Sequence, residues 1–491
     1  MKKRNNTNLF NLPGHSRPTT RREFLGRGLI SGMGIVTAPS LLGFLSHSPA
    51  ALAQAAECGI STVAASSIPF LVFDLGGGAN IAGSNVLVGG PNGQMDFLSA
   101  AGYSKLGLPA DMTPEKTGMV DTTLGLAFHA HSAMLTGIKQ LAQPDTLANT
   151  NGCIICARSE NDTANNPLNP MYGLAKAGAN GNLVTLIGTS SSESGGRSRA
   201  PASMVNLSVR PTKVSKPAEA SGIVNTGKLS TLMNPEDALL VMKAVEQLSA
   251  AKVSKITETD LVKNLLTCGY SQTTAAATQF TPASLDPTTD ADITRILGTD
   301  ITKAEMLKVA SVMKLVVGGF AGAGTIELGG FDYHNSTRAT GELRDLAAGR
   351  AIGAALEYAK AVQKPLMIYV FSDGAVDSNG QLDTTAAGGG KGVWKGDNSL
   401  TAAAFFLVYN PLGRPQLANA ANQQLGFYKP TGTLETTATP ISNNVEQLTS
   451  AIVLNYMALN DDVARFAQVL PNNGLGGAAN LDKLIAFAPI V

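Results

Sequence analysis

The chain has 491 residues, of which 44% are hydrophobic and 5% aromatic, and its formal net charge is +1. Residues 1–53 contain seven of its 37 Lys and Arg and one of its 36 Asp and Glu, so the remaining 438 residues carry a net charge of −5. This acidic balance argues against nucleic acid as a partner, because phosphate binding needs clustered Lys and Arg. The length allows one large α/β domain with insertions or two domains.

The first fifty-odd residues have the pattern of an export signal. Arg21 and Arg22 lie in the stretch TTRREFLGRG, an apolar run of 17 uncharged residues follows, and Ala51 and Ala53 suit signal peptidase. This order resembles a twin-arginine signal peptide over residues 1–53, which predicts a periplasmic or otherwise exported protein. A membrane anchor is the alternative, but the run is short for a span, so we expect no stable membrane span after cleavage.

Buried strands and amphipathic helices are expected to alternate along the rest of the chain. The strand patterns cover residues 68–73, 151–159, 182–190, 324–330, 365–374 and 402–410, and the helix patterns cover 133–141, 234–253, 259–267, 302–320, 343–363 and 443–470. This alternation predicts the α/β class, with a mostly parallel central sheet and helices on both faces. We expect residues 54–491 to form a single large α/β domain with a helical and loop-rich insertion around 190–300.

The four cysteines are Cys58, Cys153, Cys156 and Cys268. An even number in an exported chain favours two structural disulfides, with three possible pairings. Cys153 and Cys156 could instead form a redox pair or half of a zinc site. However, the chain has no second C-x-x-C, and GCIIC lies in a strand pattern rather than at the start of a helix.

Acidic side chains stand at the ends of several predicted strands. They are Asp74, Asp332 followed closely by His334, Asp373, and Asp397 just before the last strand. In parallel α/β sheets ligands gather beyond the carboxyl ends of the strands. Carboxylates that meet there repel one another unless a cation or a proton intervenes. Oxygen ligands with one imidazole suit zinc, manganese, magnesium or calcium.

A structural interpretation of the same residues stays open. Asp after a strand also caps a turn by accepting hydrogen bonds from its own backbone. His334 beside Asp332 would then be a satisfied structural pair. The spacing lacks a compact metal-ligand motif, so it does not decide between these interpretations.

The order of several motifs resembles a known family over nearly the whole mature chain. The motifs are the Gly-rich turn after the first strand, FHAHSAM, CARSEND, LGGFDYH, YVFSDG and GDNSLTAAAFFLVYNP. They resemble the exported bacterial domain-of-unknown-function family fifteen-oh-one, which is similar in fold to the alkaline phosphatase/sulfatase superfamily. The resemblance therefore implies an alkaline-phosphatase-like fold with loop insertions. In that superfamily two divalent metals are held by Asp and His at strand ends, and a Ser or Thr attacks a phosphoryl or sulfuryl group.

The chain keeps only part of the family pattern. Asp332 and His334 keep the acid and the imidazole of the family's GG-F-D-T-H segment, and His129 matches a family histidine. Asn80 stands where the first turn usually has an acid, Asn161 where an imidazole is expected, and Asn398 where a histidine is expected. Asp373 keeps the acid of its segment, whose arginine is lost.

These departures argue against a full two-metal hydrolase. A two-metal site needs ligands that neutralise and clamp both reacting oxygens, and an amide is a weaker, uncharged ligand. The resemblance still allows a site for one divalent metal, calcium or similar, held by Asp332, Asp373, Asp397 and Asn80. His334 would be a further ligand, a base or a turn residue.

No nucleophile is identified, and the catalytic residues stay unknown. Ser84 and the serines of 190–194 lie in predicted loops, where serine is common for its turn chemistry. No G-x-S-x-G motif is present.

Two functional hypotheses follow, with a third that rests on the cysteines. The first is a non-catalytic binding or scaffold protein of the envelope with a depleted metal site, whose partner is another envelope protein. The second is a metal-dependent hydrolase of phosphate or sulfate esters, whose substrate is a small ester. The third is a disulfide oxidoreductase that uses Cys153 and Cys156.

Overall fold

The computed structural model describes residues 68–160, 164–224, 280–335 and 337–491, with a few positions between 237 and 248. The chain divides into two compact units. One is formed by Met1–Leu45, Ala51–Gly59 and Val224–Thr281, and the other by Ser46–Ala50, Ile60–Ile223 and Pro282–Val491. The second unit contains all the strands described here, and the predicted insertion around 190–300 is divided between the units.

Several predictions fall on residues that the structure does not describe. The signal peptide at 1–53, the helix at 259–267 and most of the helix at 234–253 lie outside the described residues. Asn161, Cys58 and Cys268 lie outside them too.

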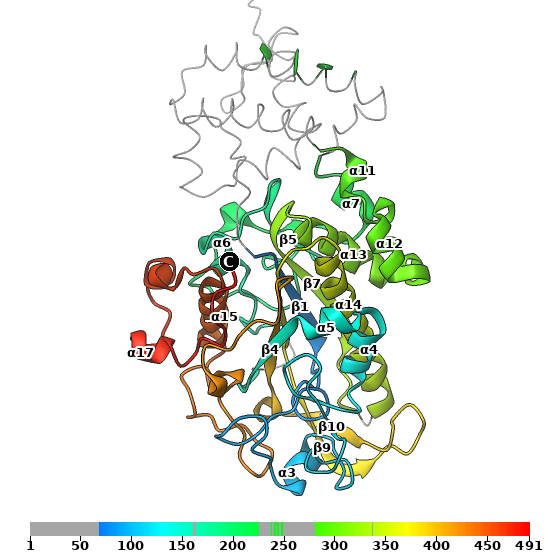
Figure 1. Cartoon of the computed structure of the whole chain (residues 1–491), viewed down its shortest axis with the longest axis vertical. Coiled ribbons are helices and arrows are strands. Elements are labelled where there is room, and N and C mark those ends of the chain that lie inside the picture. The colour runs from blue at the N-terminus through cyan, green and yellow to red at the C-terminus, as the bar shows by residue number, and fades with distance from the viewer. Residues whose placement is uncertain are drawn as a thin grey trace, which may run out of the picture. The chain divides into compact units, whose positions relative to one another are not determined.

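An eight-stranded sheet forms the centre of the second unit (Figure 1). Its strand order is β12-β4-β11-β8-β1-β7-β5-β6. Its strands are β1 (Phe70–Gly77), β4 (Thr150–Ile155), β5 (Val184–Gly188), β6 (Thr212–Lys213), β7 (Ala321–Phe331), β8 (Leu366–Ser372), β11 (Ala404–Tyr409) and β12 (Gln424–Leu425). Within this sheet β11 runs antiparallel to β4 and β8, and the other pairs are parallel. The prediction of a mostly parallel central sheet is confirmed.

The helices of the second unit include those predicted at 133–141, 302–320, 343–363 and 443–470, together with short helices that the sequence did not predict. They are α3 (Ala100–Lys105), α4 (Ala133–Leu141), α5 (Pro144–Ala148), α6 (Met171–Lys176), α7 (Pro217–Ser221), α11 (Pro282–Leu285), α12 (Ala291–Leu297), α13 (Ala304–Val317), α14 (Arg338–Ala361), α15 (Val445–Leu459), α16 (Phe466–Val469) and α17 (Ala478–Leu481). The pattern at 443–470 predicts one or two helices, and it is divided between α15 and α16, with Asp461 between them at a positive φ of 53°.

The central strand β1 is covered on both faces. Every residue from Phe70 to Gly77 is buried, as its continuous apolar run predicts. Val72 belongs to the core that β1 forms with α6 and α15. Leu71 pairs with Gly324 of β7, and a Cβ at Gly324 would meet Val316 of α13. Figure 1 shows α6 and α15 on one side of the sheet and α13 and α14 on the other, so helices cover both faces, as predicted.

Two small antiparallel sheets are absent from the sequence prediction. β2 (Val120–Asp121) pairs with β3 (Phe128–His129), and β9 (Val376–Leu382) pairs with β10 (Gly392–Asp397). Their polar and Gly-rich sequences lack the apolar alternation that marks a strand. The β9–β10 hairpin matters for the site, because β10 ends at Asp397.

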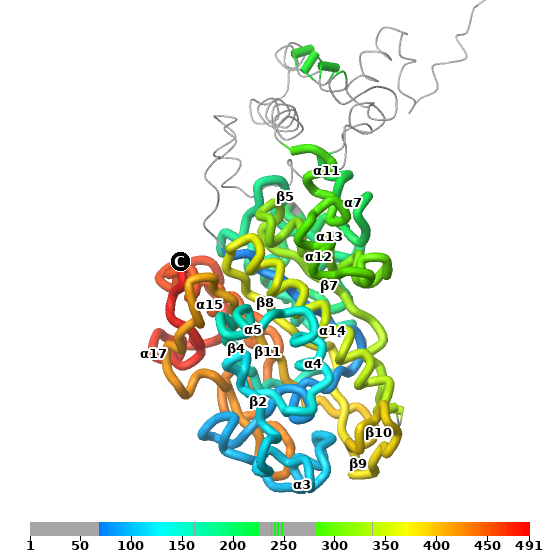
Figure 2. The backbone as a smooth tube through the Cα atoms, turned by 45° about the vertical axis from the view of Figure 1, so that its right-hand side comes forward, coloured from blue at the N-terminus to red at the C-terminus, as the bar shows by residue number. Residues whose placement is uncertain are grey.

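Helices α4 and α14 cross closely through glycines, and Figure 2 shows them side by side. A Cβ at Gly349 of α14 would overlap the carbonyl oxygen of Met134, and one at Gly137 of α4 would overlap that of Leu346. Glycine on both helices therefore lets the two backbones touch, and any larger residue must push them apart.

We expect Gly349→Ala to lower the free energy of unfolding by about 1–3 kcal/mol through this overlap, although alanine is the better helix former. Urea denaturation measures the change. The control is Gly329→Ala in β7, where the added methyl meets nothing within 4 Å and φ is not positive. The control should change stability by no more than about 0.5 kcal/mol. Equal effects of the two substitutions would contradict the close crossing.

Among the described residues, no helix combines the length and the apolar character that crossing a membrane requires.

Candidate functional site

The sheet brings the predicted acidic residues to one edge. β1, β4, β7 and β8 are mutually parallel, so their carboxyl ends lie together, and the antiparallel β11 begins at that edge. Asp74 lies near the end of β1, Asp332 follows β7, and Asp373 follows β8. Asp397 ends β10, a few residues before β11. Within this edge the side chains fall into separate groups.

The inner group consists of Asp74, Asp373, Arg197 and Ser198. Both carboxylates are fully buried. Arg197 Nε donates to Asp373 Oδ2 at 2.8 Å, and the Gly77 main-chain N–H donates to Asp373 Oδ1 at 2.8 Å. Ser198 donates to both oxygens of Asp74, through its main-chain N–H at 2.7 Å and its hydroxyl at 3.2 Å. The inner group therefore contains its own cation, and Asp373 Oδ2 also accepts from the Ala164 main-chain N–H at 3.2 Å.

The electrostatics of the inner group follow from burial and from the proximity of the two acids. Burial, together with the negative charges of Asp373 and Glu327, raises the pKa of Asp74 to about 7, and the hydrogen bond from the Ser198 main-chain N–H limits the rise. The hydrogen bond to Asp373 raises the pKa of Arg197. Arg197 is the cation that lets two buried carboxylates lie at the same strand ends.

The outer group consists of Asp332, His334 and Asp397. His334 Nδ1 lies 2.7 Å from Asp332 Oδ1 and 3.1 Å from Asp397 Oδ1, although the angles at Nδ1 form no hydrogen bond. The side chains of Asp332 and Asp397 are 59% and 53% exposed, and that of His334 is 24% exposed. Because water reaches these carboxylates, their interaction with the imidazole is weaker than that inside the inner group.

Tyr333 lies between Asp332 and His334 in the sequence, but its side chain is buried in the core. Its side chain is 1% exposed, whereas Asp332 before it is exposed and His334 after it is half-buried. Its hydroxyl accepts a hydrogen bond from the Asn80 main-chain N–H at 2.7 Å. The Asn80 side chain donates to Ser84. Asn80 is thus held through Tyr333 and Ser84.

The structure therefore brings together some predicted ligands and separates others. Asp332, His334 and Asp397 meet in the outer group, while Asp373 pairs with Arg197. The described residues include no group of three or more His, Cys, Asp or Glu side chains arranged to hold a metal ion. The divalent metal, calcium or similar, predicted at Asp332, His334, Asp373, Asp397 and Asn80 stays a prediction.

Two other residues carried over from the family pattern have structural partners. Asn398 donates to Asp377 at 2.9 Å, and its side-chain oxygen accepts from the Leu400 N–H at 3.1 Å, as in a turn cap. His129 is buried with Nε2 2.8 Å from Met112 O, and burial lowers its pKa to about 4.

Sequence reasoning missed Arg197 as a site residue. It lies in the stretch SSSESGGRSRAPAS after β5, whose composition predicts only a loop. A usable signal was present, because Arg197 is one of few cations near a predicted carboxyl strand end.

The described cysteines are both free thiols. Cys153 and Cys156 are fully buried and unpaired, so the prediction of two disulfides that use all four cysteines is wrong for these two. Burial raises the pKa of both thiols, which disfavours the reactive thiolate. Cys153 lies on β4 and Cys156 directly follows that strand, and three positions along an extended chain point the two side chains to opposite faces of the sheet, away from each other. The geometry therefore gives no support to the redox-pair hypothesis.

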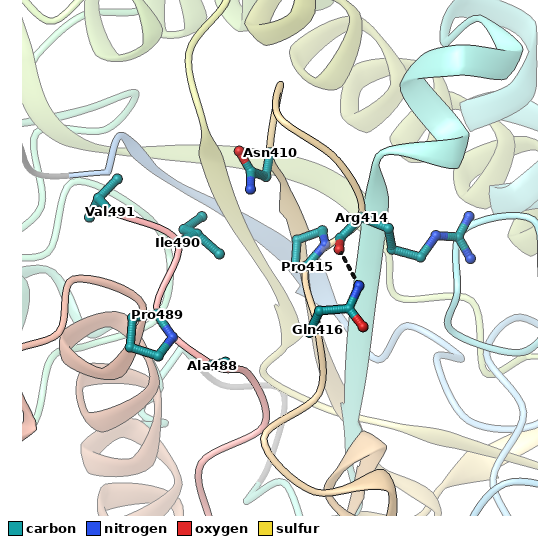
Figure 3. Close-up of a pocket in the computed structure, with 8 residues that line it drawn as sticks. All are labelled: Asn410, Arg414, Pro415, Gln416, Ala488, Pro489, Ile490 and Val491. Carbon is teal, nitrogen blue, oxygen red and sulfur yellow. Dashed lines mark hydrogen bonds between the residues drawn. The ribbon is translucent and has the colours of Figure 1, made fainter.

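A pocket of about 390 Å³ lies elsewhere on the second unit. Figure 3 shows it between the loop after β11 and the last residues of the chain. Its lining residues are Asn410, Arg414, Pro415, Gln416, Ala488, Pro489, Ile490 and Val491. None of them is a predicted site residue. Arg414 donates to the carbonyl oxygens of Ala148, Thr123 and Leu147, so its guanidinium anchors the loop.

Comparison of the chain with protein-family models, with curated proteins and with solved structures gave no match.

We expect Arg197→Met to lower the free energy of unfolding by about 2–3 kcal/mol. Without the guanidinium, the buried Asp373 carboxylate has no compensating positive charge. The Arg197 side chain is 37% exposed, so solvent screening limits the loss of stability. Urea denaturation near neutral pH measures the change, and Asp373→Asn should restore part of the lost stability in the double variant.

The matched control is Arg199→Met in the same loop. The Arg199 side chain is exposed and has no ion pair within the described residues. Equal effects at positions 197 and 199, or additive effects of Arg197→Met and Asp373→Asn, would contradict the buried pair.

Proposed function

We propose that the chain is an exported envelope protein with an alkaline phosphatase/sulfatase-like fold that acts as a non-catalytic binding or scaffold protein. The observation that carries the proposal is the Arg197–Asp373 pair beside Asp74, at the carboxyl ends of β8 and β1. The twin-arginine pattern supports export, and the motif order supports the fold and the family resemblance.

The physical argument concerns the charge at the strand ends. Two buried carboxylates at this edge need a positive charge or a proton. In the superfamily that the chain resembles, divalent metals supply the positive charge. Here the Arg197 guanidinium lies within hydrogen-bond distance of Asp373 and interacts electrostatically with Asp74 and Glu327. A guanidinium provides charge without the open coordination positions that metal-assisted hydrolysis requires.

The alternative is a metal-dependent hydrolase of phosphate or sulfate esters, and the outer group is the observation that favours it. The His334 imidazole lies between the exposed carboxylates of Asp332 and Asp397. Carboxylates and an imidazole are ligand types for a divalent cation. In this alternative the outer group would bind the metal and a small ester would be the substrate. The scaffold proposal has another envelope protein as its partner.

Elemental analysis of the mature protein separates the two functions. The protein is purified from the exported fraction without chelators, and inductively coupled plasma mass spectrometry counts divalent metals per chain. We expect no stoichiometric metal in the wild type or in Asp332→Ala, and an unchanged melting temperature on adding a chelator.

About one divalent ion per chain, lost in Asp332→Ala but retained in the matched surface variant Asp383→Ala, would overturn the scaffold proposal. A screen of phosphate and sulfate esters would then follow. Asp383 suits the control because its carboxylate accepts from Thr385 in an exposed turn, away from the outer group's contacts.

A further inference from the structure

The chain contains five asparagines that are each followed directly by glycine. The pairs are Asn92–Gly93, Asn151–Gly152, Asn180–Gly181, Asn379–Gly380 and Asn473–Gly474. Glycine has no Cβ, so its main-chain nitrogen can approach the preceding asparagine side chain without steric hindrance. Because the second residue is the same in all five pairs, differences in their reactivity come from the folded structure.

The reaction open to such a pair is an attack of the main chain on the asparagine side chain. The glycine nitrogen bonds to the asparagine Cγ, and its proton passes through water to the side-chain nitrogen, which leaves as ammonia. Water then opens the five-membered succinimide at either carbonyl group, which gives aspartate or isoaspartate. In isoaspartate the main chain runs through the former side chain and is one carbon longer. Water is the only co-reactant.

In four of the pairs, hydrogen bonds hold the asparagine side chain at 2.8–3.2 Å. The partners are Asp96 for Asn92, the Gly152 N–H, Pro415 and Gln423 for Asn151, the Gln381 N–H for Asn379, and Leu470 and the Leu475 N–H for Asn473. Two of the attacking N–H groups are also engaged. Gly93 donates to Gly90 O at 3.1 Å, and Gly380 donates to Ser378 Oγ at 3.2 Å. These pairs must break hydrogen bonds before they react.

Asn180 differs from the other four asparagines. It lies in the short connection between α6 and β5, and its side chain is exposed. Among the described residues, neither the Asn180 side chain nor the Gly181 N–H has a hydrogen-bond partner. The attacking nitrogen and the attacked amide are therefore both available without the loss of a hydrogen bond.

Packing against β7 explains why a glycine follows Asn180. A Cβ at Gly181 would lie 2.3 Å from Ala321 Cα, and a Cβ at Gly322 would lie 2.3 Å from Ala179 O. The connection thus runs directly against the start of β7, and a larger residue at 181 would overlap that strand. The residue that the fold needs at this position is also the one that makes Asn180 reactive.

We propose that Asn180–Gly181 is the isoaspartate-forming site of this protein and that isoaspartate at 180 loosens the amino end of β5. The site needs no enzyme and no cofactor. It does not depend on the function proposed above.

The loosening follows from the extra carbon of isoaspartate. The N–H groups of Asn182 and Leu183 donate to Gly319 O and Phe320 O, each at 2.9 Å. Val184, the first residue of β5, also donates to Phe320 O, at 3.1 Å. A connection that already touches β7 has no room for a longer main chain, so the extra carbon must displace these hydrogen bonds.

Peptide mapping by mass spectrometry tests the site in the mature protein, aged in slightly alkaline buffer. An isoaspartate-specific carboxyl methyltransferase identifies the isoaspartate. In the folded protein we expect Asn180 to convert about tenfold faster than Asn379, because hydrogen bonds at both Asn379 and Gly380 must break first. The same protein unfolded in urea is the reference, and there the two asparagines should convert at similar rates.

The variant Asn180→Gln tests the consequence for β5. Glutamine keeps an exposed amide at 180, but its longer side chain disfavours the five-membered ring. After ageing, hydrogen exchange of the amides of residues 182–184 should be about fivefold faster in the wild type than in Asn180→Gln, the factor of one net hydrogen bond. Before ageing, the two proteins should exchange these amides at the same rate.

Three results would overturn the proposal. The first is conversion of another of the five asparagines as fast as that of Asn180 in the folded protein. The second is an Asn180 that converts in urea and stays intact in the folded protein. The third is unchanged exchange of residues 182–184 in a protein rich in isoaspartate at 180, which would overturn the loosening.

Discussion

The ion pair between Arg197 and Asp373 is the constraint on which the site depends. Asp373 and Asp74 are both fully buried at the ends of neighbouring strands, and desolvated carboxylates cannot be held so close without a compensating charge. Arg197 supplies that charge from the loop after β5. It fixes the loop against the sheet, and Ser198, the next residue, can then satisfy both oxygens of Asp74.

The same edge of the sheet thus has two electrostatic regimes. In the inner group the carboxylates of Asp74 and Asp373 are fully buried and Arg197 is their cation, whereas in the outer group the carboxylates of Asp332 and Asp397 are exposed to water. Tyr333 lies between them in the core, with its hydroxyl bonded to the Asn80 N–H and to Asp345. Asp332 and His334 flank Tyr333 in one turn. The buried Tyr333 side chain anchors this turn, and the side chains of Asp332 and His334 are more exposed.

Local patterns predicted much of the fold, because burial on both faces leaves a continuous apolar run and an amphipathic helix leaves a period of 3.6. The strand at 68–73 and the helix at 302–320 were located in this way. The direction of β11 was not predicted, because an apolar run reads the same for a parallel or an antiparallel strand. The role of Arg197 was hidden, because its partner Asp373 is 176 residues away and a Gly- and Ser-rich loop has no periodicity.

The most direct test of Arg197 as the resident cation is a divalent-cation titration of the mature protein, followed by melting temperature. Calcium, manganese and zinc are added in turn to the wild type, to Arg197→Met and to Arg199→Met. We expect cations to stabilise Arg197→Met alone, because its buried carboxylates have lost their positive charge and a bound ion stabilises the folded state by mass action. Stabilisation of the wild type, together with no response in Arg197→Met, would show that a metal belongs to the native site and that Arg197 does not replace it.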